Sequence, residues 1–427
     1  MPLEQVANLR MSIHEYKGKM KSIYICYLSV NEPLVHTQVI PYLQALVSKN
    51  IGIVLLTFEP RLLDRQVKQK IRAQLAEIGV VWYDLPYHKF PSLLAKLWDI
   101  LVGTIYAAML IKRHQATIVH SRTHVPAAMA LVLKKVLGVK ILFDVRGLVA
   151  DEYVDAGHWK RNSLKYKITK YMEQQFFNQA DAIVVLTERI KKILHEQGRT
   201  QATRVKVIPS CVDVQRFRVD PKLAQARRSE MGLSDRVVLL YAGKFGSWYM
   251  AAEMINFFFV ARQVFPRLHF LVLTQSDHKL AYREFERCHL SRETYTVMTV
   301  PPEKVPLYFA VADAAISFIL PSFSKQSSSP TKIGEYLAAG LPIVVNTGIG
   351  DCDALLKGHG VAVLLSEFTS QAYRSAADSL RTLLSEKEEA RERCCNLADQ
   401  ELSLQKVGVP RYTEVYSFLQ GDEAWKS

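Results

Sequence analysis

Apolar, β-branched segments of strand length recur along this chain, and longer helical stretches separate them. Strands that are apolar over their whole length belong to sheets covered on both faces, and intervening helices make neighbouring strands parallel. The sequence therefore predicts an α/β protein with two parallel sheets in tandem. The predicted strands are Ser22–Tyr27, Ile53–Thr57, Thr117–His120, Lys140–Asp144, Ala182–Leu186 and Val205–Ile208 in the first unit, and Val237–Ala242, His269–Leu273, Tyr295–Val300, Ala314–Phe318 and Pro342–Val345 in the second.

The boundary between the two units is predicted where the apolar pattern lapses, between Asp213 and Asp235. We place one domain at residues 21–213 and a second at 214–400, in keeping with a chain of 427 residues that is too long for one core. Residues 1–20 are expected to be an extension, and 401–427 a helical segment that returns to the first domain. No strand is predicted after Ala362, and residues 369–399 are predicted to form one or two amphipathic helices.

The charge of the chain indicates an anionic partner. Lys and Arg number 55 against 41 Asp and Glu, a formal net charge of +14, which favours binding to a nucleotide, a phospholipid surface or a nucleic acid. The sequence contains no nucleic-acid module and no basic strand studded with aromatics, so no nucleic-acid partner is expected. The six cysteines form no C-x-x-C or Cys/His cluster, which predicts a cytoplasmic protein with reduced thiols and no metal site.

The most lipophilic stretch, Leu93–Ile111, has the length of a membrane span but contains Lys96 and Asp99. The favoured interpretation is a helix buried between a sheet and solvent. The alternative is a helix that lies on a membrane surface. Lysines and arginines of the segment 160–170 are candidates to contact an anionic leaflet.

The segment 327–340 predicts a helix with an anion-binding start. Ser329 suits the N-cap and Pro330 the first helical position. Lys332 and Glu335 share one face near that end, where free N–H groups, the helix dipole and an ammonium would bind an anion. A carboxylate one turn further on would accept hydrogen bonds from hydroxyls, as a nucleotide's diphosphate and ribose require. The alternative is a capped helix with an ordinary surface ion pair.

A second candidate loop follows the predicted strand Val237–Ala242. Gly243 and Gly246 let the backbone approach a ligand, and Lys244 lies at the carboxyl end of the strand. The alternative is an ordinary turn with a solvent-exposed lysine, which is as common as a ligand-binding loop for such a sequence. Together with Lys332, however, Lys244 would supply two cations for one diphosphate.

Charged side chains also follow two strands of the first unit: His120 and Arg122 after one strand, and Asp144, Arg146, Asp151 and Glu152 after another. Ligands of α/β sheets collect at the carboxyl ends of strands, so these residues are candidates for a site. The alternatives are a structural ion pair between Asp144 and Arg146 and a hydrogen-bonded structural histidine at His120.

Three of these segments carry a family resemblance: the junction Pro209–Asp213, the Lys244 loop and the helix segment Glu335–Gly340. They resemble GT-B glycosyltransferases of family 4 over roughly residues 22–400. The resemblance implies two Rossmann-like parallel-sheet domains that face each other across a cleft. A narrower branch of the family has Asp-x-Arg-Gly followed by Asp-Glu, as residues 144–152 do, and Ser-Ser-Pro-Thr-Lys before the helix.

The resemblance implies transfer of a sugar from a nucleotide-diphosphate sugar to a saccharide or lipid-linked hydroxyl acceptor, with retention and without a metal or other cofactor. It suggests a role in cell-surface polysaccharide or glycoconjugate synthesis, in the cytoplasm or on the inner face of the membrane. The residues implied are Gly243, Lys244, Thr331, Lys332, Glu335, Gly348 and Asp351 for the donor, Arg122, Asp144 and Arg146 for catalysis, and Asn31, His120, Asp151 and Glu152 on the acceptor side.

The sequence departs from the family pattern at four positions. The family has an acidic residue eight positions before Glu335, where this sequence has Ser327. The family's second phosphate-binding cation would fall near Met250, and we expect Lys332 to take over its role. Arg122 stands where the family has a histidine, and a segment containing Asn31 replaces a Gly-Gly turn. Two other functions stay open: a nucleotide-sugar epimerase of GT-B fold, and a non-catalytic protein that binds nucleotides or nucleic acid.

Overall fold

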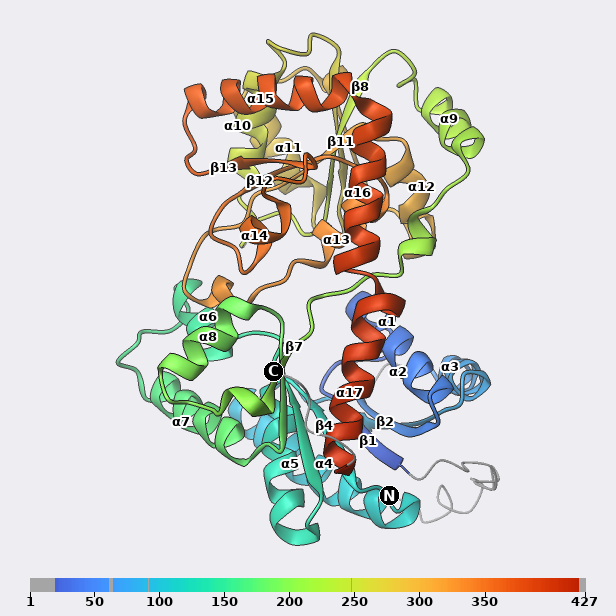
Figure 1. Cartoon of the computed structure of the whole chain (residues 1–427), viewed down its shortest axis with the longest axis vertical. Coiled ribbons are helices and arrows are strands. Elements are labelled where there is room, and N and C mark those ends of the chain that lie inside the picture. The colour runs from blue at the N-terminus through green and yellow to red at the C-terminus, as the bar shows by residue number, and fades with distance from the viewer. Residues whose placement is uncertain (1–19, 61–63, 91, 247, 422–427) are drawn as a thin grey trace.

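The computed structural model describes residues 20–60, 64–90, 92–246 and 248–421, so nearly all of the predicted extension at residues 1–20 lies outside the described residues. Two α/β lobes are stacked along the long axis of the molecule (Figure 1). The chain completes one lobe before it enters the other, and its last helices run back towards the first lobe.

Each lobe is built on a parallel sheet. The N-terminal sheet has the order β3-β2-β1-β4-β5-β6-β7 and the C-terminal sheet the order β10-β9-β8-β11-β12-β13. The order reverses between β1 and β4 and between β8 and β11, and ligands of such sheets bind at these switch points. The strands are β1 Met20–Cys26, β2 Ile51–Glu59, β3 Val80–Pro86, β4 Ile118–Arg122, β5 Lys140–Asp144, β6 Ala182–Val185, β7 Val205–Val207, β8 Val237–Ala242, β9 Leu268–Leu273, β10 Tyr295–Met298, β11 Ala314–Ser317, β12 Ile343–Asn346 and β13 Ala362–Leu365.

All eleven predicted strands are present, with ends within two residues of the prediction. The prediction missed β3 and was wrong that no strand follows Ala362, because β13 starts there. Both missed strands lie at sheet edges. An edge strand pairs on one side only and tolerates short or polar sequences, such as Asp84 in β3, so its pattern is weaker than that of a central strand.

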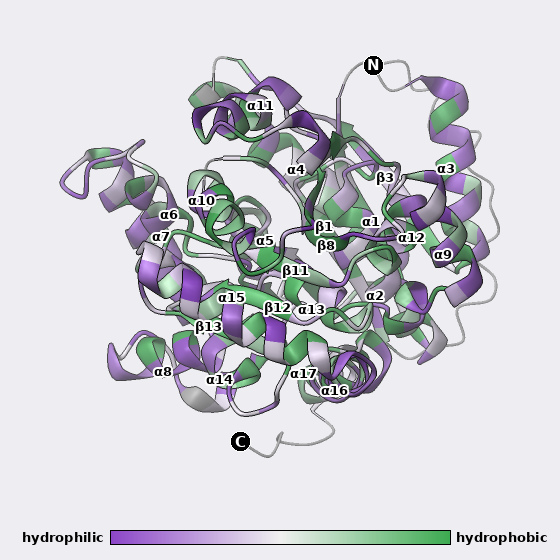
Figure 2. Ribbon diagram, turned by 90° about the horizontal axis from the view of Figure 1, so that it is seen from above, coloured by the Kyte–Doolittle hydropathy of each residue, from purple (hydrophilic) through white to green (hydrophobic). Residues whose placement is uncertain are grey.

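Helices cover both faces of each sheet. In the N-terminal lobe, α4, α5, α7 and α8 pack on one face and α1, α2, α3 and the C-terminal α17 on the other. Figure 2 shows hydrophobic strands inside and helices of mixed character around them. The helices are α1 Pro33–Gln38, α2 Ile40–Ser48, α3 Arg65–Glu77, α4 Ser92–His114, α5 His124–Leu137, α6 Val149–Asp155, α7 Leu164–Gln179, α8 Glu188–Glu196, α9 Pro221–Glu230, α10 Ala251–Ala261, α11 His278–Arg287, α12 Val305–Ala310, α13 Thr331–Ala338, α14 Cys352–Leu356, α15 Ser370–Ser385, α16 Lys387–Glu401 and α17 Val409–Gln420.

The helical prediction for residues 369–399, which left open one or two helices, is confirmed, and the structure has two, α15 and α16. After them the chain crosses to the N-terminal lobe, where α17 contacts α2 (Figure 1). The Tyr416 hydroxyl lies 3.0 Å from Nδ1 of His120 and donates to the Ser22 hydroxyl at 3.2 Å. The last helix therefore ties the start and the centre of the N-terminal sheet to the end of the chain.

Helix α4 has one side buried in the core and one side exposed. Its inner side packs in the core through Ala107, Leu110 and Ile111, and Asp99 accepts a hydrogen bond from Tyr27. By length and composition it is the one described helix that could cross a membrane, but its inner side is part of the lobe. The expectation of a buried helix is correct for this side and wrong for the outer side, where Trp98 and its neighbours are exposed.

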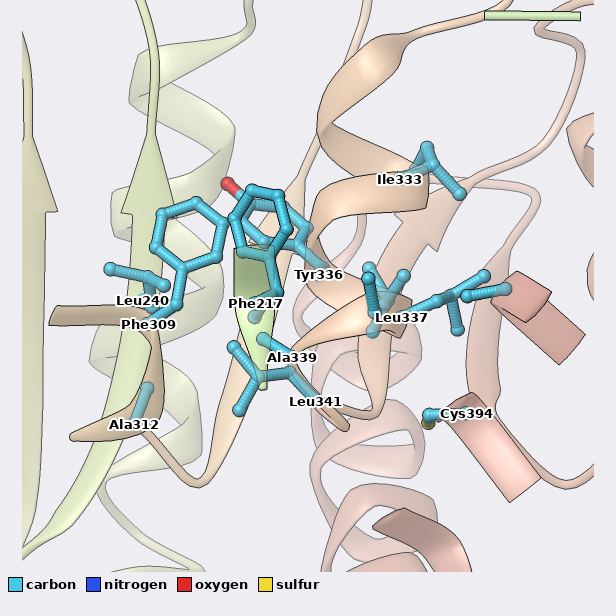
Figure 3. Close-up of a cluster of buried hydrophobic side chains, with 14 of the residues drawn as sticks. Phe217, Leu240, Phe309, Ala312, Ile333, Tyr336, Leu337, Ala339, Leu341 and Cys394 are labelled. Carbon is cyan, nitrogen blue, oxygen red and sulfur yellow. The ribbon is translucent and has the colours of Figure 1, made fainter. Parts of the chain in front are cut away.

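Helix α13 is anchored in the core of the C-terminal lobe. Ile333, Tyr336 and Leu337 point into a cluster that includes Phe217 and Phe309 (Figure 3). The Tyr336 hydroxyl also accepts a hydrogen bond from the Ala242 N–H at 2.8 Å, which ties the helix to the end of β8. Helix α13 therefore has a fixed position relative to the switch point of its sheet.

We expect Leu337→Ala to lower the free energy of unfolding of the C-terminal lobe by about 2–5 kcal/mol, because it removes a fully buried side chain. Chemical denaturation followed by circular dichroism measures this change. The matched control is Leu223→Ala on the exposed side of α9, which should stay within about 0.5 kcal/mol of the wild type. Equal effects of the two variants would contradict the anchoring role of Leu337.

Candidate active site

The start of α13 carries no side-chain cap. The helix begins at Thr331 with Pro330 as N-cap, one residue later than predicted. The predicted cap Ser329 instead accepts a hydrogen bond at its Oγ from the backbone N–H of Ser210, at 3.0 Å. The N–H of Ile333 donates to the Pro330 carbonyl at 3.0 Å, whereas the N–H groups of Thr331 and Lys332 have no partner among the described residues. These two groups are left for another partner, and the positive end of the helix dipole is directed at the space in front of them.

That space is a cavity of about 240 Å³ between the two lobes. The C-terminal lobe contributes Trp248, Tyr249, Lys325 and residues 328–331 at the start of α13. The N-terminal lobe contributes residues that include Arg122 and Arg146 at the ends of β4 and β5, and Leu34 and Gln38 from α1. The cavity thus joins the carboxyl ends of strands from both sheets to one helix N-terminus, and three of the predicted site residues line it: Arg122, Arg146 and Thr331.

Lys332 is a buried cation beside this cavity. Its ammonium lies 3.5 Å from the ring centroid of Tyr249 and 4.6 Å from that of Tyr241. It makes no ion pair within the part of the chain that the structure describes. Burial lowers its pKa from 10.5 to about 7, against the opposing effect of Glu335. The ammonium also donates a long hydrogen bond to the Tyr241 hydroxyl, at 3.4 Å. With two aromatic rings, one hydroxyl and no ion-paired carboxylate around it, the charge is poorly compensated and would bind an anion strongly.

Gly243 makes room for this ammonium. A Cβ atom at Gly243 would lie 2.5 Å from Nζ of Lys332, and the φ angle of Gly243 is +149°. The predicted donor loop and the predicted donor helix therefore meet at this point. Lys244 itself is exposed, and its carbonyl accepts a hydrogen bond from the Tyr241 hydroxyl, so its assignment to the donor stays a prediction.

Arg122 and Arg146 share one carboxylate. Asp144 accepts hydrogen bonds from Arg122 at 3.3 Å and from Arg146 at 2.9 Å. Burial alone would raise the pKa of Asp144, but the opposing effects of Arg146, His120 and Arg122 are larger together. The pKa of Asp144 is therefore held well below the usual range for an aspartate. Asp144 is fully buried beneath the two guanidinium groups. Asp144 therefore holds the two arginines that line the cavity, and its own part in catalysis stays a prediction.

Sequence reasoning missed Lys325. It lies in the 3₁₀ turn Ser324–Ser327, within the loop that follows β11 at the switch point. Its ammonium sits 4.0 Å from the ring centroid of Trp248 and 3.4 Å from Oε1 of Glu152 in the other lobe. The rule that ligands collect at strand ends points to this loop, but nothing in its sequence marks Lys325 among its polar neighbours.

Glu335 lies one turn beyond Lys332 on α13. Burial raises the pKa of its carboxyl, and Arg216 and Lys332 oppose that rise. The carboxylate makes no hydrogen bond to any described residue. It therefore keeps its acceptor capacity for a ligand, as predicted for a group that binds hydroxyls.

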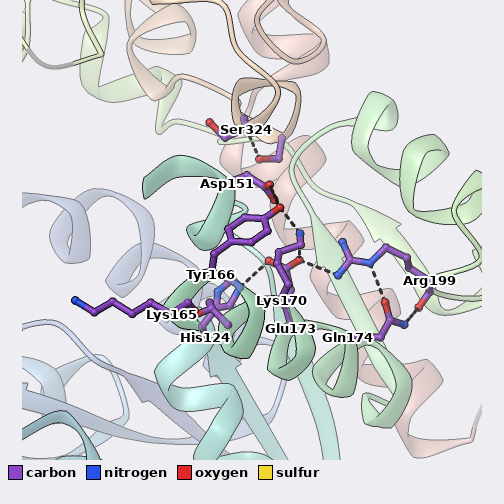
Figure 4. A network of polar contacts seen from close by, with 11 residues as sticks. His124, Asp151, Lys165, Tyr166, Lys170, Glu173, Gln174, Arg199 and Ser324 are labelled. Carbon is purple, nitrogen blue, oxygen red and sulfur yellow. Dashed lines mark hydrogen bonds and ion pairs between the residues drawn. The ribbon is translucent and has the colours of Figure 1, made fainter. Parts of the chain in front are cut away.

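Three predicted site residues have structural partners instead. His120 is buried against Tyr416, and burial lowers its pKa although Asp144, 3.7 Å from its Nε2, opposes that change. Asp151 is buried and accepts hydrogen bonds from Tyr166 at 2.9 Å and Lys170 at 2.8 Å (Figure 4). Asp351 accepts hydrogen bonds from the backbone of Glu188 and Arg189 at the start of α8, in the other lobe. These contacts occupy the three side chains in the ligand-free protein, and their roles at the site stay predictions.

Two other predicted residues are not among those that line the cavity. Asn31 is exposed just before α1, although Leu34 and Gln38 of that helix do line it. Gly348 has a φ of +88° and donates its N–H to Asp353. Their roles stay predictions. The residues that the structure describes contain no group of three or more His, Cys, Asp or Glu side chains arranged to hold a metal ion.

Comparison with known proteins bears on this geometry. The sequence model of Glycosyltransferase Family 4 matches residues 36–216. No curated protein sequence matches the chain.

Similar solved structures include a glycosyltransferase from Rickettsia africae (14% identity, TM-score 0.72, covering 95% of this chain and 100% of that one). HepE of Anabaena in complex with UDP and glucose is 12% identical with a TM-score of 0.71 and covers 93% and 100%. Sucrose-phosphate synthase of Thermosynechococcus elongatus is 12% identical with a TM-score of 0.73 and covers 95% and 100%. At these identities the structures establish the fold, which is the GT-B arrangement predicted from the sequence.

We expect Lys332→Met to stabilise the ligand-free protein by about 1–4 kcal/mol at pH 7, because a buried, poorly compensated amine is replaced by an apolar side chain of similar length. The unfolded lysine keeps its proton up to about pH 10.5, whereas the folded one loses it above about pH 7. Between these values the unfolded state binds more protons, so the stability of the wild type rises with pH.

The advantage of the Met variant should therefore shrink between pH 7 and pH 10. Denaturation midpoints of both proteins across this range measure it. A difference that stays constant with pH would contradict the low pKa of Lys332.

Proposed function

We propose that this chain of GT-B fold is a family 4-like glycosyltransferase, which transfers a sugar from a nucleoside-diphosphate sugar to a hydroxyl acceptor in the cavity between the lobes. The observation that carries this proposal is the buried Lys332 ammonium beside the uncapped start of α13. The presence of UDP in HepE of Anabaena, a protein of the same fold, supports a nucleoside diphosphate as the anion.

In the proposed reaction, the bond between the anomeric carbon and the β-phosphate oxygen breaks, and a bond from the acceptor oxygen to that carbon forms. The acceptor's proton passes to the departing diphosphate, so no separate protein base is required. Negative charge grows on the diphosphate, and fixed cations and helix N–H groups stabilise it without reorganisation. We assign this role to Lys332, Lys325 and the first turn of α13, and propose retention of configuration without a metal or other cofactor.

Hydrogen-bonding groups around the diphosphate would hold the rest of the donor. Glu335 keeps its carboxylate oxygens available and is proposed to accept hydrogen bonds from ribose hydroxyls. Lys244 and Gly348 belong to the loops after β8 and β12 and are proposed to approach the donor. On the opposite wall, Arg122 and Arg146 are held by Asp144 and are proposed to position the acceptor.

Contacts between the lobes support a closed arrangement around the donor. The Thr187 hydroxyl donates to the carbonyl of Gln326 at 2.7 Å, and the N–H of Ser324 donates to Asp155 at 2.9 Å. These bonds seat the loop after β11 on α6 and α8. Closure of this kind excludes water and would limit hydrolysis of the donor.

For the acceptor, we propose a saccharide or lipid-linked molecule in the synthesis of a cell-surface polysaccharide or glycoconjugate. The net positive charge and the exposed Lys160 and Lys165 support contact with an anionic membrane on its cytoplasmic side. In this arrangement the enzyme would be cytoplasmic and peripheral.

We expect the nucleoside diphosphate that best stabilises the wild type in a thermal-shift panel to lose that effect with Lys332→Ala. Loss of one preorganised cation should also lower kcat by about 10²–10³-fold. The matched control is Lys279→Ala on the exposed side of α11, which should respond to the ligand as the wild type does. A full shift in Lys332→Ala, or no stabilisation of the wild type by any nucleoside diphosphate, would overturn the proposal.

Lys325→Met should weaken nucleoside-diphosphate binding about 10-fold or more, because its ammonium lines the same cavity. Lys304→Met, on the exposed surface of the same lobe, is the control. Glu152→Gln removes the ion pair but keeps the lysine, so it should bind the ligand at least as tightly as the wild type. If Glu152→Gln and Lys325→Met weakened binding equally in a titration, Lys325 would serve only to tie the lobes together.

A further inference from the structure

The outer side of α4 is a continuous apolar stripe. Leu94, Trp98, Leu101, Ile105 and Met109 follow one another at intervals of three or four residues, so they share one face of the helix. Each of them is more than half exposed. A stripe of this size on a soluble lobe normally marks an interaction surface.

The neighbouring helices extend the stripe. Helix α5 packs between α4 and α7 in the layer that covers one face of the N-terminal sheet. On α5, Val136 is 71% exposed, and on α7 Leu164 and Tyr171 are 72% and 64% exposed. We call the exposed apolar residues of α4, α5 and α7 the outer face: Leu93, Leu94, Leu97, Trp98, Leu101, Ile105, Met109, Val132, Val136, Leu164, Ile168 and Tyr171.

The charges around the outer face have one sign. The three helices contain two acidic residues, Asp99 and Glu173, and both are buried. Asp99 is held by Tyr27 and His88. Glu173 is held by His124, Lys170 and Arg199, as Figure 4 shows.

Exposed cations therefore surround the apolar residues with no exposed carboxylate on the same helices. They are Lys96 and Lys112 on α4, Lys135 on α5, and Lys165 and Lys167 on α7. In Figure 4 the Lys165 side chain extends away from the buried network.

This combination of apolar residues and positive charges distinguishes between two possible partners, a second copy of the chain and a lipid membrane. In a symmetric dimer the same patch faces itself, so lysines would face lysines with no carboxylate to compensate them. A lipid leaflet with anionic headgroups offers both an apolar interior and negative charge. Trp98 and Tyr171 are of the type that is enriched at the boundary between lipid and water.

Helix α4 is expected to lie in the plane of such a leaflet. Its inner side belongs to the core of the lobe, through Ala107 and Leu110. The Asp99 contacts tie it to the loop that precedes it and to Tyr27, directly after β1. It would therefore insert side chains without crossing the membrane.

We propose that the outer face docks the enzyme on an anionic leaflet, with apolar side chains of α4, α5 and α7 inserted and the surrounding lysines at the headgroups. This deepens the membrane part of the proposed function and rests on that function only for its biological purpose. Docking would keep the N-terminal lobe, whose Arg122 and Arg146 line the cavity, at the surface where lipid-linked acceptors reside.

The test is sedimentation of the full chain with vesicles. The wild type should bind vesicles of phosphatidylcholine with phosphatidylglycerol and should bind phosphatidylcholine alone much more weakly. The variant Leu97→Gln/Leu101→Gln/Ile105→Gln should lose binding about tenfold or more, because these side chains would no longer insert. The matched control Leu223→Gln/Leu280→Gln, exposed in the C-terminal lobe, should bind as the wild type does.

A second variant tests the charge. Lys165→Glu/Lys167→Glu should lower binding to the anionic vesicles, and added salt should weaken wild-type binding. All of these variants should keep the wild-type thermal shift with a nucleoside diphosphate, so failure of docking is distinguishable from failure of the proposed reaction. The proposal is overturned if the wild type ignores anionic vesicles, if the triple variant binds like the wild type, or if the triple variant only converts a dimer to a monomer.

Discussion

The site depends on one buried ammonium that lacks a carboxylate partner. Lys332 is held between Tyr249 and Tyr241, its pKa is lowered by burial, and the residues that the structure describes give it no ion pair. Such a group costs stability in the free protein. The cost is offset when an anion enters, because the ammonium and the open N–H groups of α13 then acquire a partner together. A protein that needed only a stable helix would have little reason to keep this lysine buried.

The rest of the C-terminal lobe fixes where that ammonium sits. Ile333, Tyr336 and Leu337 fix α13 in the core, and the Tyr336 hydroxyl binds the end of β8. Gly243 then allows the approach of Lys332, and Tyr249 follows from the same loop. On the other side of the cavity, Asp144 holds two arginines by a single buried carboxylate. Each lobe thus presents cations on a rigid support, which is the condition for electrostatic stabilisation of a leaving group.

Much of the architecture could be predicted from the sequence, because central parallel strands are apolar throughout and the helices between them are long. The edge strands β3 and β13 were not predicted, because a strand that pairs on one side only has a weaker sequence pattern. Within the site, Lys332, Arg122 and Arg146 could be predicted, since strand ends and helix starts have recognisable sequences. The role of Lys325 could not, because it arises from contacts with Trp248 and Glu152 that are distant in sequence. The same reason explains why the contacts of Asp151 with α7 and of Asp351 with α8 could not be predicted.

The most direct measurement is a crystal structure of the protein with the nucleoside diphosphate that stabilises it most. The account predicts phosphate oxygens within hydrogen-bonding distance of the Lys332 ammonium and of the N–H groups that open α13, inside the cavity lined by Arg122 and Arg146. A diphosphate bound elsewhere, or a first turn of α13 filled by protein atoms in the complex, would contradict it.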